Sequence, residues 1–347
     1  MRGSSSITVT ELDWSRRTEW DAYVEAHSEG SVYHLSAWKR IFERAFKQRA
    51  YLLAARQAGE LVGILPLLHI KSRIFGNSLV SMGHLVYGGA LTHGGDASEA
   101  LDQAAIELGV RLDVDYLEYR SRTPRHSDWP RREGRYATFR KPLSPDPEAN
   151  LKAIPRKQRA VVRKAIKGGL KSSITQEVDT LHKIMAVSYR NLGTPSFSRR
   201  YFGILKEELG DRCDILVVDT EGESVAAVMS FYFKGEVAPY YGGSLAVARR
   251  LGANDFMYWE VMRRACARGF TLFDFGRSKI GTGAYNFKKY WGFEPEPLNY
   301  EFVLRKAREV PDMSPLNPKY QRAIAIWKRL PVALTMRIGP LIARNLG

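Results

Sequence analysis

The sequence is poor in cysteine, which limits both disulfide and redox chemistry. Its 347 residues include two, Cys213 and Cys266. Neither belongs to a C-x-x-C pair, and both stand among apolar residues. A disulfide framework and a thiol redox motif are therefore excluded, and we expect two buried thiols in a protein of the reducing cytoplasm.

Motifs for metal binding and for nucleophilic catalysis are also missing. The seven histidines form no H-x-H or H-x-x-x-H pair, and His84 and His93 have no carboxylate at a ligand-like spacing. No G-x-S-x-G elbow or local cysteine–histidine arrangement occurs. We expect no bound metal, and any group transfer should proceed by direct attack without a covalent enzyme intermediate.

Long apolar runs are absent as well. The stretch LVGILPLLHI, residues 61–70, has ten residues, about half of the length that spans a bilayer. The N-terminal MRGSSS lacks the apolar core of a signal peptide. We therefore expect no transmembrane helix.

Acidic residues are few relative to basic ones. The chain has 53 Lys and Arg against 37 Asp and Glu, a formal net charge of +16. Such a surplus favours polyanionic partners: RNA, phosphorylated substrates or an anionic membrane surface. The alternative is a basic surface that serves solubility alone.

Two parts of the chain repeat each other. Residues 51–71 and 215–235 each consist of a β-rich run, a turn at Gly59 or Gly222, and a second β-rich run, which predicts a hairpin in each copy. Both copies then reach a tyrosine followed by two glycines: YGGAL (87–91) and YGGSL (241–245). The repetition indicates a duplicated module.

The elements after the hairpins also correspond. They are two amphipathic helices, 98–110 and 254–270, and two short strands, 115–121 and 271–278. Ser98 and Asn254 are the expected N-caps of the helices. The order predicts an α+β module in which a strand, a helix and a second, parallel strand follow the hairpin.

A basic segment joins the copies. Residues 141–149 contain three prolines and read as a linker. Residues 151–171 have apolar positions at helical spacing, and from Lys152 to Lys171 they carry eight Lys or Arg and no acid. Pro155 suits the first turn of this helix. A face of one charge sign favours contact with an anion over simple solvation.

The C-terminal segment 314–347 has six basic residues and no acid, with short apolar helical runs interrupted by Pro331 and Pro340. Such a composition suits an element lying on anionic lipid. Alternatively, the segment packs as a helix across the first copy.

The order of elements resembles the tandem GNAT-fold transferases of the Fem family, and more closely the FemAB-related proteins associated with exosortase and PEP-CTERM systems. The resemblance extends from about residue 7 to 347. It rests on five stretches: SVYHLSAWKRIF (31–42), VGILPL (62–67), VYGGAL (86–91), IPRKQRAVVRKAIKGGL (154–170) and, most specific, the segment 253–298 containing DFGRSKIGTGAYNFKKYWGFEP.

The resemblance implies an α+β fold of two tandem GNAT domains. We expect a first domain at 1–145, a basic linker helix at 146–170, a second domain at 171–303 and a basic tail at 304–347.

The resemblance also implies transfer of an acyl or amino-acid group from aminoacyl-tRNA or acyl-CoA, used as a co-substrate, to an amine or hydroxyl acceptor. Fem enzymes act on peptidoglycan precursors, so a phosphorylated cell-envelope or exopolysaccharide precursor is the expected acceptor, at the inner face of the cytoplasmic membrane. The helical hairpin that some Fem proteins insert has no counterpart here, which weighs against tRNA. The alternatives are an acyl-CoA-dependent N- or O-acetyltransferase of an exported sugar or amine, and a non-catalytic anion-binding scaffold.

In a GNAT module the phosphates of the donor lie at the N-terminus of the helix that follows the central strands. The loop ARRLGAND of the second copy resembles the acetyl-CoA pattern R-x-x-G-x-[GA], whereas THGGDASEA (92–100) of the first copy has no arginine. The expected donor-binding residues are therefore Arg249, Arg250, Gly252, Ala253 and Asn254.

The motif after residue 271 provides the expected catalytic residues. Asp274 can accept a proton or orient an amine, or else cap the turn that follows. Lys288 matches a phenylalanine–lysine pair of the family and can stabilise a tetrahedral intermediate. Tyr285 belongs to the same cluster, with a core aromatic as its alternative, and Arg277 can bind a phosphate or carboxylate.

Acceptor binding, by the resemblance, involves groups from both copies. Each arginine among them has a structural salt bridge as its alternative. The expected residues, besides Arg277, are Trp38, Lys39, Tyr87, Gly88, Arg190, Arg199, Tyr201 and Tyr241.

Overall fold

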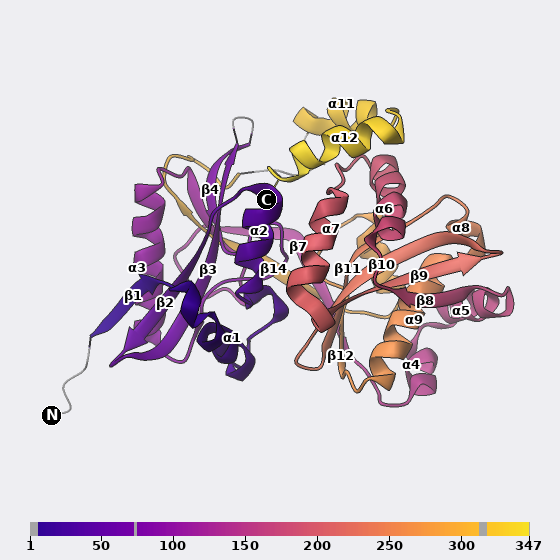
Figure 1. Cartoon of the computed structure of the whole chain (residues 1–347), viewed down its shortest axis with the longest axis horizontal. Coiled ribbons are helices and arrows are strands. Elements are labelled where there is room, and N and C mark those ends of the chain that lie inside the picture. The colour runs from indigo at the N-terminus through magenta and orange to yellow at the C-terminus, as the bar shows by residue number, and fades with distance from the viewer. Residues whose placement is uncertain (1–5, 73–74, 312–317, 347) are drawn as a thin grey trace. The chain divides into compact units, whose positions relative to one another are not determined.

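The computed structural model describes residues 6–72, 75–311 and 318–346 (Figure 1). The chain forms two compact units. The first comprises Met1–Arg135, Leu298–Asp312 and Asn345–Gly347, and the second comprises Tyr136–Pro297 and Met313–Arg344. Both are mixed α/β units, as expected from the duplicated pattern.

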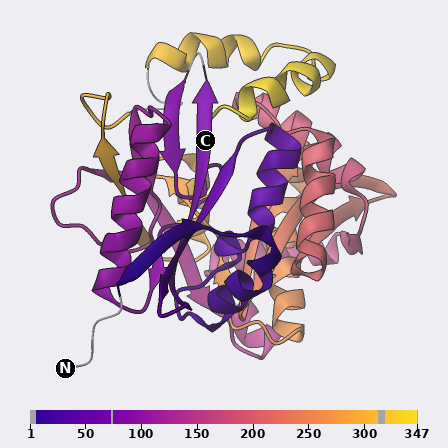
Figure 2. The ribbon, with the colours of Figure 1, turned by 60° about the vertical axis from the view of Figure 1, so that its left-hand side comes forward.

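The first unit contains a sheet with the order β1-β2-β3-β4-β6-β14. Its elements are β1 (Ile7–Glu11), α1 (Arg17–Ala26), α2 (Ala37–Phe46), β2 (Ala50–Gln57), β3 (Glu60–Ser72), β4 (Gly76–Val80), β5 (Leu91–Thr92), α3 (Gly95–Arg111), β6 (Tyr116–Tyr119) and most of β14 (Pro295–Leu304), with 3₁₀ turns at Trp14–Arg16 and Val32–His34. Helix α3 packs along β1, β2 and β3 (Figure 2), and its leucines close a core with β2 and β3.

The second unit contains a sheet with the order β7-β12-β11-β10-β9-β8. Its elements are β7 (Arg131–Pro142), α4 (Pro147–Ala153), α5 (Arg156–Lys167), β8 (Lys171–Thr175), α6 (Val178–Leu192), α7 (Arg199–Leu209), β9 (Cys213–Thr220), β10 (Glu223–Phe233), β11 (Glu236–Ser244), α8 (Ala248–Leu251), α9 (Ala253–Ala267), β12 (Leu272–Asp274), β13 (Ser278–Lys279), α10 (Gly283–Tyr290), α11 (Pro318–Trp327) and α12 (Val332–Ala343), with a 3₁₀ turn at Gly210–Arg212. Helices pack against this sheet, and β10 is buried along nearly its whole length.

The predicted hairpins are confirmed. Strands β2 and β3 pair antiparallel around Ala58 and Gly59, and β9 and β10 around Glu221 and Gly222. In both turns the two central residues have positive φ, 50° and 87° in the first and 50° and 84° in the second. This is the twist that two-residue hairpins require, and glycine adopts it without strain.

The expected parallel pairs are also present. Strand β4 pairs with β6, and β11 with β12, with α3 and α9 in the respective connections. The predicted N-caps are wrong, however, because α3 begins after Gly94 and α9 after Gly252. Ser98 and Asn254 lie inside the helices, since glycine turns end the preceding loops earlier than the apolar spacing indicates.

One strand of each unit comes from beyond the other copy in the sequence: β14, which follows the second copy, belongs mostly to the first unit, and β7, which follows the first copy, belongs mostly to the second. In the first unit β14 pairs with β6, from Glu301 opposite Tyr119 to Leu304 opposite Tyr116. In the second unit β7 pairs with β12, from Leu272 opposite Pro142 to Asp274 opposite Arg140. The compact units therefore divide the chain differently from the expected boundaries at 145 and 303, because a strand belongs to the sheet whose edge it pairs with.

The basic segment is not one linker helix. It forms α4 and α5, separated at Ile154 and Pro155, and α5 ends before Gly168. Pro155 forces its predecessor into an extended conformation, with φ −70° and ψ 132° at Ile154, so one continuous helix cannot form. Val162 and Ala165 of α5 are buried in the core of the second unit.

The C-terminal helices belong to the second unit, where α12 packs on α6. Residues 318–344 thus group with the second copy. Pro331 separates α11 from α12 as expected, whereas α12 continues through Pro340. No helix in the described ranges has the length and apolar content that crossing a bilayer requires.

Candidate active site

The two parallel strands of the second unit diverge, and the candidate site lies where they separate. Strands β11 and β12 pair at Glu236–Leu272 and Val237–Phe273, after which β11 continues to Ser244 while β12 ends at Asp274. Helix α6 lies directly against the end of β11. A side chain at Gly243 would place its Cβ 3.1 Å from the Cα of Met185.

Asp274 is fully buried at the end of β12. Its Oδ1 accepts a hydrogen bond from the backbone N–H of Gly276 at 2.6 Å, and its Oδ2 lies 3.5 Å from Nε of Arg140. Arg140 also pairs with Glu236 at 2.6 Å. The carboxylate therefore caps the turn that follows it, which was one of the two expected roles, and it has no direct access to solvent.

Lys288 lies on α10 and reaches back to the same turn. Its Nζ donates to the backbone carbonyls of Phe275, Gly276 and Arg277 at 2.7, 2.9 and 3.3 Å. Burial lowers the pKa of this ammonium to about 7 and the charge of Arg277 adds to the effect, while the charge of Asp274 opposes it. All three donor positions of Lys288 are thus directed at the turn, whereas stabilising an oxyanion would require one of them to be released.

Arg277 and Tyr285 lie on the two sides of this turn. The guanidinium of Arg277 is half-buried and stacks 4.7 Å from the ring centre of Tyr136. Tyr285 packs edge-on against Phe139 with ring centres 5.3 Å apart. The positive φ of Gly276, 65°, allows the chain to turn so that Arg277 reaches the surface.

The loop expected to bind donor phosphates forms α8, the left-handed Gly252 and the first turn of α9. Gly252 has φ 67°, and a Cβ at this position would lie 2.7 Å from Cγ1 of Val161 on α5. Ala253 is buried and Asn254 half-buried, while Arg249 and Arg250 are exposed. The predicted residues are therefore brought together at the start of α9, and α5 lies beside them.

The exposed face of α5 is strongly basic. Of the residues that the structure describes, none forms an ion pair with the exposed cations of α5 and α8. These cations are Arg156, Lys157, Arg163, Lys164, Lys167, Arg249 and Arg250. Unpaired cations next to a helix N-terminus form a surface suited to a polyanion.

Tyrosine side chains near the end of β11 escaped the sequence analysis. A Cβ at Gly242 would lie 3.5 Å from Oη of Tyr258, and the ring of Tyr258 packs 4.9 Å from that of Phe275. Burial raises the pKa of Tyr258 to about 12, and it also raises the pKa of the neighbouring Tyr189. The sequence signal was the position of Tyr258, five residues after Ala253 begins α9.

Of the expected acceptor residues of the second unit, Tyr201 and Tyr241 come together, but inside the core, while Arg190 and Arg199 bind other partners. Tyr201 and Tyr241 are buried and share a hydrogen bond between their hydroxyls, 2.7 Å long. Arg190 donates to the carbonyl of Lys328 at 3.1 Å. Arg199 forms two hydrogen bonds with Asp179, 2.5 and 2.7 Å long, which is the salt-bridge alternative.

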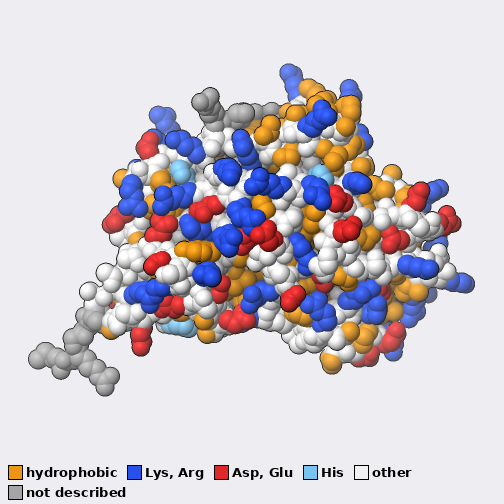
Figure 3. Space-filling model, viewed as in Figure 1, with side chains coloured by type: hydrophobic (Ala, Val, Ile, Leu, Met, Phe, Trp, Pro, Cys, Tyr) orange, Lys and Arg blue, Asp and Glu red, His pale blue; other side chains and the backbone are white. Residues whose placement is uncertain are grey.

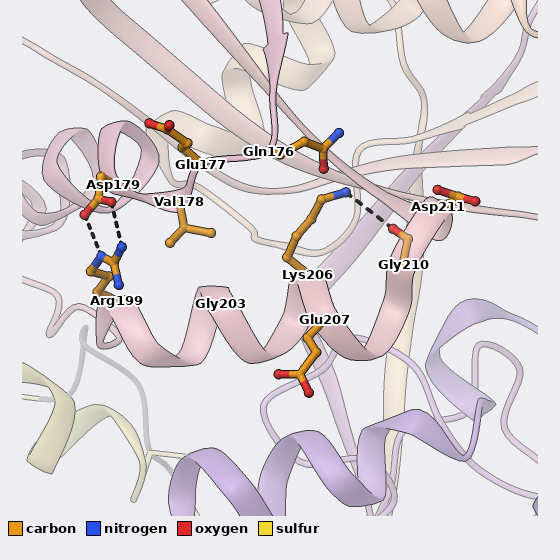
Figure 4. A pocket seen from close by; sticks show the side chains of 10 residues that line it. All are labelled: Gln176, Glu177, Val178, Asp179, Arg199, Gly203, Lys206, Glu207, Gly210 and Asp211. Atoms are coloured by element: carbon orange, nitrogen blue, oxygen red, sulfur yellow. Dashed lines mark hydrogen bonds and ion pairs between the residues drawn. The ribbon is translucent and has the colours of Figure 1, made fainter.

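Arg199 also lines an open groove of about 700 Å³ along α7 (Figure 4). Figure 4 shows Arg199 turned toward Asp179 at one end and Lys206 toward Gly210 at the other. Of the charged groups on this groove, Arg199 and Asp179 pair with each other, and Lys206 binds a backbone carbonyl.

In the first unit, two of the four expected residues line a cavity. Tyr87 and Gly88 border a small cavity of about 20 Å³ that Arg122 and Ser121 also line. Trp38 is fully buried and donates to the carbonyl of Val32 at 2.7 Å, so it belongs to the core.

Lys39 is tied down by its neighbours. Its ammonium donates to Glu43 at 2.8 Å and to the carbonyl of Ala50 at 2.7 Å. Within 6–72, 75–311 and 318–346, no three His, Cys, Asp or Glu side chains gather as metal ligands would.

The comparisons with known proteins agree with this geometry. Residues 156–289 match the family model described as an acetyltransferase (GNAT) domain. No curated protein sequence matches the chain.

Several solved structures share the fold. FemX is 15% identical, with a TM-score of 0.68, and covers 91% of this chain and 100% of its own. A tandem GNAT protein from the clavulanic acid biosynthesis pathway is 13% identical, with a TM-score of 0.54 and coverage of 86% and 98%. L-PGS from Bacillus licheniformis is 14% identical, with a TM-score of 0.53 and coverage of 97% and 98%.

The expected fold is confirmed: the chain has a tandem GNAT architecture, with a GNAT domain over residues 156–289. The expectation of an acyltransferase is confirmed with it.

Proposed function

We propose that the second unit transfers an acyl or aminoacyl group from an activated donor to an amine or hydroxyl of a phosphorylated cell-envelope or exopolysaccharide precursor. The observation that carries the proposal is the divergence of β11 and β12 beside the start of α9, inside the segment that matches the GNAT domain. We also propose, from the sequence motifs, that the chain is related to the exosortase-associated proteins.

The donor binds at the start of α9. The first backbone N–H groups of α9 and the positive end of its dipole favour the diphosphate of a donor such as acyl-CoA. Arg249 and Arg250 are exposed and close to these groups in the chain. The unpaired basic face of α5 extends the same positive surface and supports a longer polyanion, such as aminoacyl-tRNA, as the second donor class.

The reaction consists of one acyl transfer. The acceptor nitrogen or oxygen forms a bond to the donor carbonyl carbon, and the bond to the thiolate or ribose oxygen breaks. The hydroxyl of Tyr258, whose pKa burial raises to about 12, is protonated near neutral pH, as that of an exposed tyrosine is, and we assign it as the proton donor to the leaving group. The acceptor loses one proton to solvent and the tyrosinate of Tyr258 takes one proton back, so the balance closes and the enzyme is restored.

Asp274 and Lys288 act on the turn between them. Asp274 caps it from the strand and Lys288 binds its carbonyls from α10, so that Arg277 is held at the surface of the turn. We assign Arg277 to a phosphate or carboxylate of the acceptor. Tyr285 supports β7 through Phe139.

The expected acceptor contact at Tyr87 and Gly88 would lie at the rim of their cavity, because about 20 Å³ has room for about one water molecule. The cavity is bordered by Arg122, whose guanidinium lies 5.8 Å from the ring centre of Tyr87. An arginine over an aromatic ring suits an anionic group bound to a sugar or base. A cytoplasmic location at the inner face of the membrane fits such an acceptor.

The experiment is a mass-spectrometric assay of the full chain with cell-envelope precursors and either acyl-CoA or aminoacyl-tRNA. We expect one precursor to gain the mass of the transferred group. Tyr258→Phe should lower kcat by about 10²-fold, while the exposed Tyr290→Phe should leave it unchanged. Arg249→Gln with Arg250→Gln should raise the KM for the donor, with Lys183→Gln on the exposed side of α6 as the matched control.

A second candidate function is acyl-CoA-dependent acetylation of an exported sugar or amine, favoured by the match to the acetyltransferase model. Mass gain with acetyl-CoA alone would select it. Absence of mass gain with every donor, together with salt-sensitive binding of polyanions, would contradict both candidates and identify an anion-binding scaffold.

A further inference from the structure

Helices α11 and α12 belong to the second unit. Helix α12 packs on α6, and its Gly339 lies so close to the loop after α6 that a Cβ would be 3.1 Å from backbone atoms of Ser196. Gly193, at the end of α6, approaches Ile324 of α11 in the same way. Both contacts need glycine, so the two helices are fitted to α6 at close range.

Helix α12 fully buries small residues only, and its large apolar residues are half-buried or exposed. The buried positions carry small residues, Thr335, Gly339 and Ala343. The leucines point outward: Leu334 is 42% exposed and Leu341 57% exposed. An amphipathic surface helix normally buries its leucines, so the outer face of α12 has a purpose other than the stability of this fold.

Exposed apolar side chains gather around this helix pair. Nine large hydrophobic residues are markedly exposed in the described part of the chain, and four of them lie on α12, α11 or the last residue of α6. Besides Leu334 and Leu341 they are Ile326, 63% exposed, and Leu192, 66% exposed. Clustered apolar exposure marks an interaction surface, whereas scattered exposure does not.

The same surface is purely cationic. Residues 318–344 contain no Asp or Glu. Figure 3 shows hydrophobic and basic side chains interspersed over α11 and α12. The exposed cations are Arg322, Lys328, Arg329, Arg337 and Arg344.

We propose that α11, α12 and the end of α6 dock on an anionic bilayer. Leu192, Ile326, Leu334 and Leu341 enter the headgroup region, while the flanking Arg and Lys bind lipid phosphates. Helices of 10 and 12 residues lie in the interface and cannot cross it.

Two other occupants fit this surface less well. RNA would use the cations but leave four large apolar side chains in water. A second copy joined by a twofold axis would place this cationic surface against the same cationic surface, which costs free energy because residues 318–344 contain no acid. The proposal is independent of the transfer reaction, since it concerns neither the donor loop nor the turn at Asp274.

The test is flotation of the full chain with two kinds of vesicle. One kind contains phosphatidylcholine alone. The other contains about 30% phosphatidylglycerol, which gives it the negative charge of an anionic leaflet. We expect binding to the anionic vesicles only. Leu334→Ser with Leu341→Ser should weaken binding about tenfold or more, since two anchors are lost. Arg337→Gln with Arg344→Gln should weaken it and reduce its salt dependence.

The matched control is Val110→Ser with Ile174→Ser, which removes two exposed apolar residues outside this surface and should change nothing. Equal thermal midpoints for all variants would show that folding is intact. Unchanged flotation of the leucine variant, or no flotation of the natural chain, would overturn the proposal. Two further results would overturn the proposal. One is a dimer in sedimentation velocity that dissociates in the leucine variant. The other is RNA binding by the natural chain that the leucine variant loses.

Discussion

The two copies treat one local pattern in different ways. In the first unit β6 carries Glu118 followed by Arg120, and the two form a buried ion pair 2.8 Å long. Arg120 also donates to the carbonyl of Leu85 at 2.7 Å. In the second unit β12 ends in Asp274. Phe275 and Gly276 then separate it from Arg277, one residue more than separates Glu118 from Arg120, and Arg277 is half-buried at the surface.

The difference shows that the same strand end can serve a structural role in one copy and form part of the candidate site in the other. One added glycine separates the acid from the arginine in the second unit. The acid then caps the turn, and α10 supplies Lys288 to hold the turn's carbonyls. In the first unit the corresponding groups satisfy each other internally. We therefore place group transfer in the second unit.

The largest expected effect is on stability, and it tests whether Glu118 and Arg120 of the first copy have a structural role. Arg120→Met leaves Glu118 buried without its cation and should lower the free energy of unfolding by about 3–5 kcal/mol. Urea denaturation measures the change. The control is the neighbouring half-buried Arg122→Met, for which we expect less than about 1 kcal/mol. A mild effect of Arg120→Met would mean that the pair is not essential.

In the second unit the corresponding change is Lys288→Met. It leaves carbonyls of the 275–277 turn without a donor and should cost about 2 kcal/mol, together with most of the turnover because Arg277 loses its support. Lys289→Met alters an exposed lysine one position away and should change neither. Loss of turnover with unchanged stability would instead assign Lys288 a direct role at the reacting carbonyl.

Opposite pH dependences should sharpen the contrast between the units. The folded pKa of Lys288, about 7, lies below its ordinary value of 10.5, so the unfolded chain binds more protons between these values. The contribution of Lys288 to stability therefore rises with pH from 7 to 10.5, by about 1 kcal/mol per pH unit.

In the first unit, the contribution of His126 to stability changes with pH in the opposite direction. Burial disfavours its charge, but hydrogen bonds to Asp102 and Glu301 outweigh burial and raise its pKa from 6.5 to about 9. Its stabilisation is complete below pH 6.5 and is lost as the pH rises through 9. Urea denaturation of the natural chain, Lys288→Met and His126→Gln at pH 6, 7.5 and 9 isolates each contribution by difference. If the contributions of Lys288 and His126 to the free energy of unfolding changed with pH in the same direction, the contrast between the units would be contradicted.

The smallest effect compares the two helix starts. Gly252→Ala places a Cβ 2.7 Å from Val161 at φ 67° and should cost about 1 kcal/mol while raising the KM for the donor. Gly94→Ala meets no atom within 4 Å in an extended conformation and should be nearly neutral. Circular dichroism melts of both variants measure this difference, and equal losses would show that the start of α9 is not specially packed.

The sequence alone determined the duplicated pattern. Glycine turns at Gly59 and Gly222 predicted the hairpins, and the helix between parallel strands was recognisable from its apolar spacing, because both signals depend on neighbouring residues. The cluster around Asp274 was also predictable, since its members lie within about fifteen residues of one another.

The tertiary structure decided which strand completes each sheet, which face of α5 is buried and what Lys288 binds. These depend on contacts between residues far apart in the chain, such as Glu301 with Tyr119 and Gly252 with Val161. Local propensity carries no information about such partners. For the same reason Tyr258 became a candidate only once α9 was seen to bring it over Gly242.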